Sequence, residues 1–255
     1  MDINKILHVA TFAGQIILES GGETYRVEET IWRICKAFGV EHADSFVTPT
    51  GIMATVSDED HKTTSLVKRI HKRTVNLEKI SRVNDLSRNI QTQNLSVDQF
   101  YDELLKIENG KRYSTLITLF FSALGAAAFS ILFGGNIKDA IAAFIIGIVI
   151  KLFSNLCNEF NINDFFINSI SGAIVAGMAL VSVKLGMASN TDIVIIGAVM
   201  LLVPGLAITN AIRDTIAGDL VSGLTRAAEA FLIAISIAVG TGAILILWLK
   251  NFGGI

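Results

Sequence analysis

The sequence contains little cysteine and little proline, with two residues of each among its 255. Cys35 and Cys157 lie far apart, and the chain has no CxxC motif and no cluster of cysteine with histidine. We therefore predict neither a disulfide bond nor a zinc site. The chain also lacks a glycine-rich phosphate loop and metal-ligand spacing, so we predict no cofactor and no metal.

Charge is scarce as well, since 17% of the residues are charged and the net charge is −2. Without an overall basic surplus, the sequence does not indicate a nucleic-acid partner. One local exception lies between residues 62 and 88, where eight basic residues accompany only Glu78 and Asp85. We interpret this segment as a solvated face, and the alternative is a surface that lies on anionic lipid headgroups.

The few charges are unevenly distributed, and they divide the chain in two. Residues 1–113 hold 15 of the 21 lysines and arginines and 16 of the 23 acidic residues. We expect a small α/β domain over 1–113 and an α-helical, polytopic transmembrane domain over 114–255, with the boundary near Lys111 and Arg112. The N-terminus has neither a basic n-region nor a small-residue cleavage site, so the first domain is expected to stay in the cytoplasm.

The first domain shows the apolar spacing of four helices and a short stretch typical of strands. The helices are expected over 3–20, 24–38 and 77–90, with a fourth after Ser96. Ser96 and Gln99 have the spacing of a capping box. The turn-forming residues 49–51 separate two strand-like segments, which predicts a β-hairpin, and a third strand is expected near 64–70 across an acidic turn at 58–60.

The second domain contains long apolar segments that predict five membrane-spanning helices. They are expected over 114–133, 140–156, 165–186, 193–208 and 227–249. The fourth segment is short and contains Pro204-Gly205, so we interpret it as a broken helix. Interrupted spans indicate the binding site of a transporter, because irregular backbone at membrane depth must face protein or water. The alternative is a kinked helix with a purely structural role.

Polar residues follow this break in a regular pattern. Those from Asp219 to Glu229 are spaced to share one helical face. These residues, the Pro204-Gly205 break and the lysine within span two form our candidate substrate or ion pathway. Its members are Lys151, Pro204, Gly205, Thr209, Asn210, Arg213, Asp214, Asp219, Ser222, Arg226 and Glu229. The alternative is an interfacial helix whose charges form structural ion pairs.

Two motifs in the chain resemble the threonine/serine exporter family. The first is Glu19-Ser20-Gly21-Gly22-Glu23-Thr24-Tyr25-Arg26-Val27-Glu28. The second comprises Pro204-Gly205, Asn210, Arg213-Asp214, Gly218-Asp219, Gly223 and Arg226. The resemblance is to the larger subunit of the split form of these exporters. It implies a separate smaller membrane subunit that carries the remaining helices.

The resemblance implies export of a small polar metabolite, either a threonine- or serine-type amino acid or a dicarboxylate such as succinate. It also implies a multi-pass protein of the prokaryotic inner membrane with a cytoplasmic N-terminus, and not an enzyme. Small residues on spans three and five (Gly172, Gly177, Gly240 and Gly242) predict an oligomer. The alternatives are a membrane-anchored hydrolase with catalysis around residues 19–29, and a scaffold that transports nothing.

Overall fold

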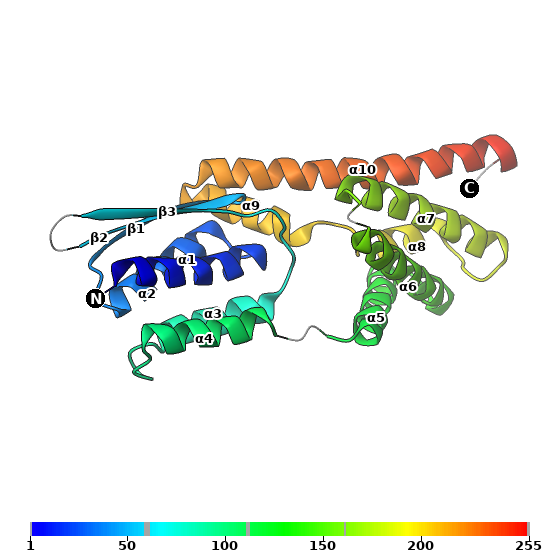
Figure 1. Ribbon diagram of the computed structural model, residues 1–255. Coiled ribbons are helices and arrows are strands. Elements are labelled where there is room, and N and C mark those ends of the chain that lie inside the picture. Colours follow the sequence, from blue (N-terminus) through cyan, green and yellow to red (C-terminus); the bar gives the residue numbers. More distant parts are fainter. Residues whose placement is uncertain (1, 59–61, 111–112, 161, 254–255) are drawn as a thin grey trace. The chain divides into compact units, whose positions relative to one another are not determined.

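The computed structural model describes residues 2–58, 62–110, 113–160 and 162–253. The chain forms two compact units (Figure 1). The first unit comprises Met1–Lys111 and Gly205–Ala228, and the second comprises Arg112–Pro204 and Glu229–Ile255. The first unit thus draws in a segment that the sequence places within the transmembrane part. The predicted boundary at residues 111–112 lies outside the described residues.

The first unit is built around helix α1. Its helices are α1 (Ile3–Glu19), α2 (Thr24–Ala37), α3 (Leu77–Arg88) and α4 (Val97–Glu108). All four match the predicted helices, and α4 begins with the predicted capping box between Ser96 and Gln99. Helix α1 packs against the other three helices and against the sheet. Most of its side chains between Ile6 and Leu18 are therefore buried in one apolar core.

The strands of the first unit form an antiparallel sheet in the order β1-β2-β3. They are β1 (His42–Thr48), β2 (Gly51–Ser57) and β3 (Thr63–Arg69). The predicted hairpin and third strand are confirmed, and Thr48 pairs with Gly51 across the turn. Val47, Ile52 and Val56 belong to the same buried core as α1. Most of the predicted acidic turn between β2 and β3 falls on residues 59–61, outside the described residues.

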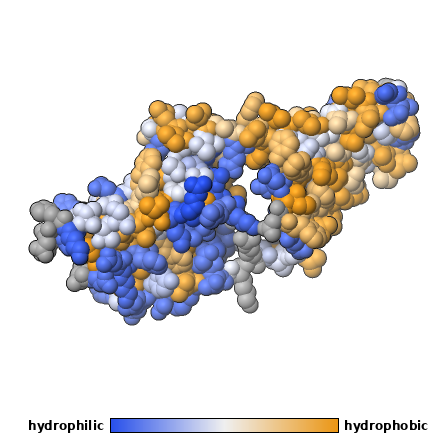
Figure 2. Space-filling model, turned by 45° about the horizontal axis from the view of Figure 1, so that its top comes forward, coloured by the Kyte–Doolittle hydropathy of each residue, from blue (hydrophilic) through white to orange (hydrophobic). Residues whose placement is uncertain are grey.

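The second unit consists of apolar helices. They are α5 (Thr115–Leu132), α6 (Ile137–Glu159), α7 (Asp164–Lys184), the short α8 (Thr191–Val199) and the greater part of α10 (Leu220–Phe252). In the described part of the chain, four helices are long and apolar enough to cross a membrane, namely α5, α6, α7 and α10. Many of their large side chains are exposed, and on the face drawn in Figure 2 the surface of this unit is largely hydrophobic.

The fourth predicted span, over 193–208, does not form a membrane-length helix. Helix α8 ends at Val199 after 9 residues, the backbone up to Pro204 is not helical, and α9 (Gly205–Ala217) begins a new helix. The predicted break is therefore present. Proline lacks an N–H group and restricts the residue before it, so the apolar run is divided into two short pieces.

Glycines allow α7 and α10 to approach closely within the second unit. A Cβ atom on Gly172 would lie 2.7 Å from the carbonyl oxygen of Ile237, and one on Gly240 would overlap the carbonyl oxygen of Ser169. The Thr241 hydroxyl also donates to the Gly172 carbonyl over 3.3 Å. These two glycines thus serve contacts within one chain, so they no longer argue for an oligomer, whereas a Cβ on Gly242 would meet no atom within 4 Å.

Asp139, near the start of α6, joins two loops of the second unit. It is 1% exposed and accepts backbone N–H groups of Asn136 at 3.1 Å, Ser189 at 2.6 Å and Asn190 at 3.0 Å. The carboxylate caps its own helix and also holds the turn that leads into α8. Our sequence reasoning did not single this residue out, although its capping-box spacing from Asn136 was visible.

Candidate functional site

The candidate site lies in the first unit, where α9 and the start of α10 meet the loop between α1 and α2. Helix α9 ends at Ala217, Gly218 takes the left-handed conformation with φ +96°, and α10 begins at Leu220. Gly21 in the loop is also left-handed, with φ +88°. A side chain at either position would be strained, which is why glycine suits both turns.

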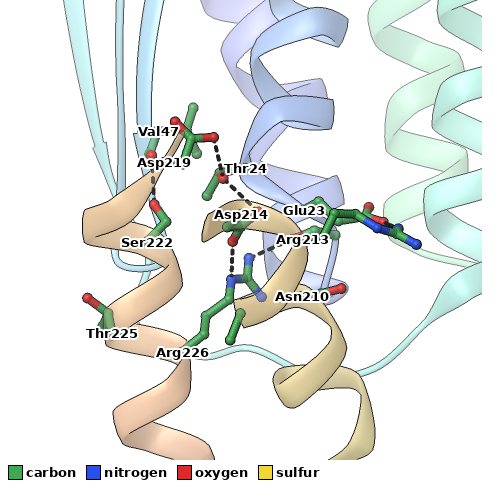
Figure 3. A network of polar contacts seen from close by, with 12 residues as sticks. Glu23, Thr24, Val47, Asn210, Arg213, Asp214, Asp219, Ser222, Thr225 and Arg226 are labelled. Carbon is green, nitrogen blue, oxygen red and sulfur yellow. Dashed lines mark hydrogen bonds and ion pairs between the residues drawn. The ribbon is translucent and has the colours of Figure 1, made fainter. Parts of the chain in front are cut away.

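At the centre of the site, Asp214 and Arg226 form a buried ion pair (Figure 3). The Asp214 Oδ2 to Arg226 Nε distance is 3.0 Å, and the side chains are 0% and 4% exposed. The Thr24 hydroxyl lies within hydrogen-bond distance of two carboxylates, at 3.0 Å from Asp214 Oδ1 and 3.3 Å from Asp219 Oδ2. One hydroxyl proton is thus shared between two acidic groups, of which Asp214 also pairs with Arg226.

Side chains of α9 and α10 also bind the loop backbone. The Asn210 amide donates to the Gly21 carbonyl over 3.0 Å, and the Arg226 guanidinium donates to the Gly22 carbonyl over 2.8 Å. The Ser222 hydroxyl donates to the Val47 carbonyl over 3.3 Å. The first two bonds satisfy carbonyl groups of the loop that follows α1, and all three attach segments that lie 175 to 204 residues apart in sequence.

A second cluster of charges surrounds Glu23 at the start of α2. Its carboxylate pairs with Arg26, at 2.9 Å from Nε, and with Arg213 of α9. The Arg213 side chain is 48% exposed, whereas Glu23 is 10% exposed. Arg213 therefore offers part of its guanidinium to solvent while the rest is engaged by Glu23.

Burial shifts two carboxyl groups of the site toward the protonated form. The pKa of Asp214 is raised by its removal from water, with Asp219 adding to the rise and Arg226 and Thr24 opposing it. The pKa of Glu28 is also raised by burial and by the neighbouring Asp219 and Asp214, although its carboxylate accepts the Val47 N–H over 2.9 Å. Such a group gains or loses a proton closer to neutral pH than an exposed carboxylate does.

The structure brings together six of the predicted pathway residues, namely Asn210, Arg213, Asp214, Asp219, Ser222 and Arg226. Gly205 and Thr209 lie on the exposed side of α9, where the Thr209 hydroxyl donates to the Gly205 carbonyl over 2.9 Å. Lys151, Pro204 and Glu229 belong to the second unit. Within the described residues, no group of three or more His, Cys, Asp or Glu side chains is arranged to hold a metal ion.

Sequence reasoning did not assign Glu23 and Thr24 to this site. Both residues belong to the first family motif and to the segment 19–29 of the hydrolase alternative, but not to the predicted pathway. The available indication that these residues belong to the site was the presence of both family motifs, in order, in one chain. Nothing in either motif alone indicated that they meet in space.

The apolar helices of the second unit and the helix–sheet first unit define a multi-pass membrane protein. The chain belongs to the ThrE family, described as putative threonine/serine exporters, whose family model matches residues 8–248. The prediction of a membrane exporter of this family is thereby confirmed. No solved structure matches the chain.

Two curated relatives illustrate the range of the family. The probable succinate transporter subunit YjjP of Escherichia coli is 24% identical over 242 residues, which cover 92% of this chain and 91% of the relative. The threonine/serine exporter of Corynebacterium glutamicum is 24% identical over 246 residues, which cover 93% of this chain but only 50% of the relative. The chain thus spans nearly all of the first relative and half of the second.

Proposed function

We propose that this chain is the larger subunit of a secondary exporter, and not an enzyme, and that it moves a small polar metabolite out of the cell. The observation that carries the proposal is the reversed polarity of α9. Its Asp214 is fully buried in the first unit and its Arg213 pairs with Glu23, whereas Ile208, Ile212 and Ile216 are 42%, 57% and 81% exposed. A helix of a water-soluble domain buries its apolar side instead.

The same reversal continues into the start of α10. Leu220, Val221 and Leu224 are 64%, 63% and 73% exposed, while Ser222 and Arg226 are buried. Apolar surface outside and charge inside is the arrangement expected for a segment in or against a bilayer, with its charges on a polar path. This supports a role for the segment 205–228 in the solute pathway.

In this proposal the two arginines have different tasks. Arg213, half exposed, binds the solute carboxylate, since a guanidinium forms strong paired hydrogen bonds with carboxylates. Arg226, buried, holds Asp214 in place. Asp214 and Asp219 share the Thr24 hydroxyl, so a proton on either changes the charge beside the loop. This makes them, with Glu229, our candidate carriers of a coupling proton.

We further propose five membrane passages, with α8 and the following break as the fourth, and a cytoplasmic N-terminal domain over 1–113. The membrane is the prokaryotic inner membrane. The proposed partner is a smaller membrane subunit, in agreement with the word subunit in the name of the E. coli relative and with the greater length of the C. glutamicum relative. The two names also give the candidate solutes, a dicarboxylate and a threonine- or serine-type amino acid.

The hydrolase alternative loses its support at the acidic residues. Glu23 is engaged by two arginines, and Glu28 accepts a backbone N–H group of β1. These contacts occupy both carboxylates. The scaffold alternative does not explain the exposed apolar side of α9. A protein that is only anchored to the membrane needs one spanning helix and no such surface.

Efflux from proteoliposomes tests the proposal. Vesicles loaded with labelled L-threonine, L-serine or succinate would contain this chain alone, or this chain with the smaller subunit. We expect gradient-driven efflux of at least one solute when both subunits are present. Arg213→Gln should lower the initial rate about tenfold, because one charge-assisted contact is lost. This corresponds to an increase of about 1.4 kcal/mol in the activation free energy. Lys138→Gln, which changes an exposed cation of the second unit, is the matched control. Absence of efflux for all three solutes with both subunits would refute the proposal.

A further inference from the structure

The first unit contains a pocket beside the candidate site, lined by α2, α3, α9 and the loop between α1 and α2. Its volume is about 360 Å³. That lies at the small end of the range of about 300–1,000 Å³ for ligand sites, which suits a metabolite of a few carbon atoms. The charged and amide side chains lining it are Glu23, Arg26, Asn84, Asp85, Arg88 and Asn210.

The charges in the pocket are balanced but not all engaged. Arg26 is paired with Glu23 at 2.9 Å. On the opposite wall, Asp85 and Arg88 project from α3 into the pocket lining, and in the described parts of the chain neither has an ion-pair partner within 4 Å. One anion and one cation therefore remain available to a ligand, about one helical turn apart.

Two amides complete the lining. The Asn84 carbonyl oxygen accepts the Thr30 hydroxyl over 3.4 Å, which leaves the Asn84 NH₂ group free to donate to a carboxylate. The Asn210 NH₂ group is occupied by the Gly21 carbonyl, which leaves its own oxygen to accept from an ammonium group. The amides thus repeat the pattern of the charges, with one donor and one acceptor available.

We infer that this pocket of the first unit is a binding site for a zwitterionic amino acid, with Arg88 and Asn84 contacting its carboxylate and Asp85 and Asn210 contacting its ammonium group. A dicarboxylate fits less well, because its second carboxylate would face Asp85. The inference deepens the proposed function and rests on it for the link to export. The binding itself does not depend on transport.

Isothermal titration of the purified full chain in mild detergent tests the inference, with L-threonine, L-serine and succinate as ligands. We expect saturable binding of an amino acid and weaker or no binding of succinate. Arg88→Gln and Asp85→Asn should each raise the Kd for the amino acid about tenfold, since each removes one charge-assisted contact. Arg82→Gln and Glu78→Gln change exposed charges on the same helix outside the pocket, so they should leave the Kd unchanged.

Three results would overturn the inference. They are no saturable binding of either amino acid, equal effects of the pocket and control variants, and succinate binding that needs Arg88 but not Asp85. Efflux measured in parallel separates this failure from failure of the proposed function. If the vesicles export an amino acid while the pocket variants bind and transport normally, the exporter stands and the pocket does not. If binding behaves as expected but no solute is exported, the pocket stands and the exporter does not.

Discussion

Replacing Arg226 with glutamine removes the cation that forms an ion pair with Asp214, while keeping a polar side chain of moderate length. The two charged groups lie 3.0 Å apart with almost no exposed surface. After the change, Asp214 keeps the Thr24 hydroxyl at 3.0 Å but loses its counter-charge. The Gly22 carbonyl also loses its donor, which lies 2.8 Å away in the unaltered protein.

The expected cost follows from the burial of both partners. Removing one member of a buried ion pair costs about 3–5 kcal/mol, because the other charge remains out of water. Asp214 can reduce this cost by taking up a proton, since burial already raises its pKa. We therefore expect Arg226→Gln to lower the free energy of unfolding of the first unit by about 3 kcal/mol, at the lower end of that range.

The double variant identifies the cause. Asp214→Asn alone leaves a buried guanidinium without its anion and should cost a similar amount. Asp214→Asn combined with Arg226→Gln leaves two neutral amides. The loss of unfolding free energy in this double variant should therefore be about 2 kcal/mol smaller than the sum of the losses in the two single variants. Arg213→Gln is the control, because its side chain is 48% exposed and a solvated ion pair contributes about 1 kcal/mol or less.

Tryptophan fluorescence can report on the first unit alone. The chain has two tryptophans, and Trp32 lies on α2 whereas Trp248 lies on α10 in the second unit. In a Trp248→Phe background, denaturation in mild detergent followed at Trp32 gives the free energy of unfolding around the site. The reasoning would be refuted if Arg226→Gln were no more destabilising than Arg213→Gln, or if the effects of the single variants were simply additive.

Three further predictions test other parts of the structure. Asp139→Ala leaves three backbone N–H groups without their acceptor and should destabilise the second unit by about 2 kcal/mol or more, measured at Trp248, whereas Lys138→Ala should have little effect. The pKa of Glu28 is raised in the folded state, so the stability that its protonated form contributes is lost as pH rises from its unfolded pKa through its folded pKa. The free energy of unfolding of Glu28→Gln, relative to that of the unaltered protein, should therefore rise over that pH range. A difference that stays constant with pH would contradict this. A reporter enzyme active only outside the cytoplasm should work when fused after Gly253 and fail when fused after Gly110, and equal activity at both sites would refute the five-span topology.

Local features of the fold could be predicted because nearby residues cause them. Ser96 and Gln99 cap a helix through atoms three residues apart, and Pro49 pre-sets the first corner of the hairpin turn. Long apolar runs identified α5, α6 and α7, since only a helix satisfies its own backbone in a bilayer. The interruption at Pro204 was equally visible, because proline acts on the residues beside it.

The sequence by itself therefore determined the elements, the division of charge and the two motifs, all of which depend on residues close together in the chain. Only the tertiary structure decided that α9 leaves the apolar run and joins the first unit, and that Asp214 and Arg226 meet Thr24 and Gly22. These contacts connect positions about 190 to 200 residues apart. No local periodicity encodes such a pairing. Buried charged side chains have no water to bind, so they need partners, and here those partners come from a distant part of the chain.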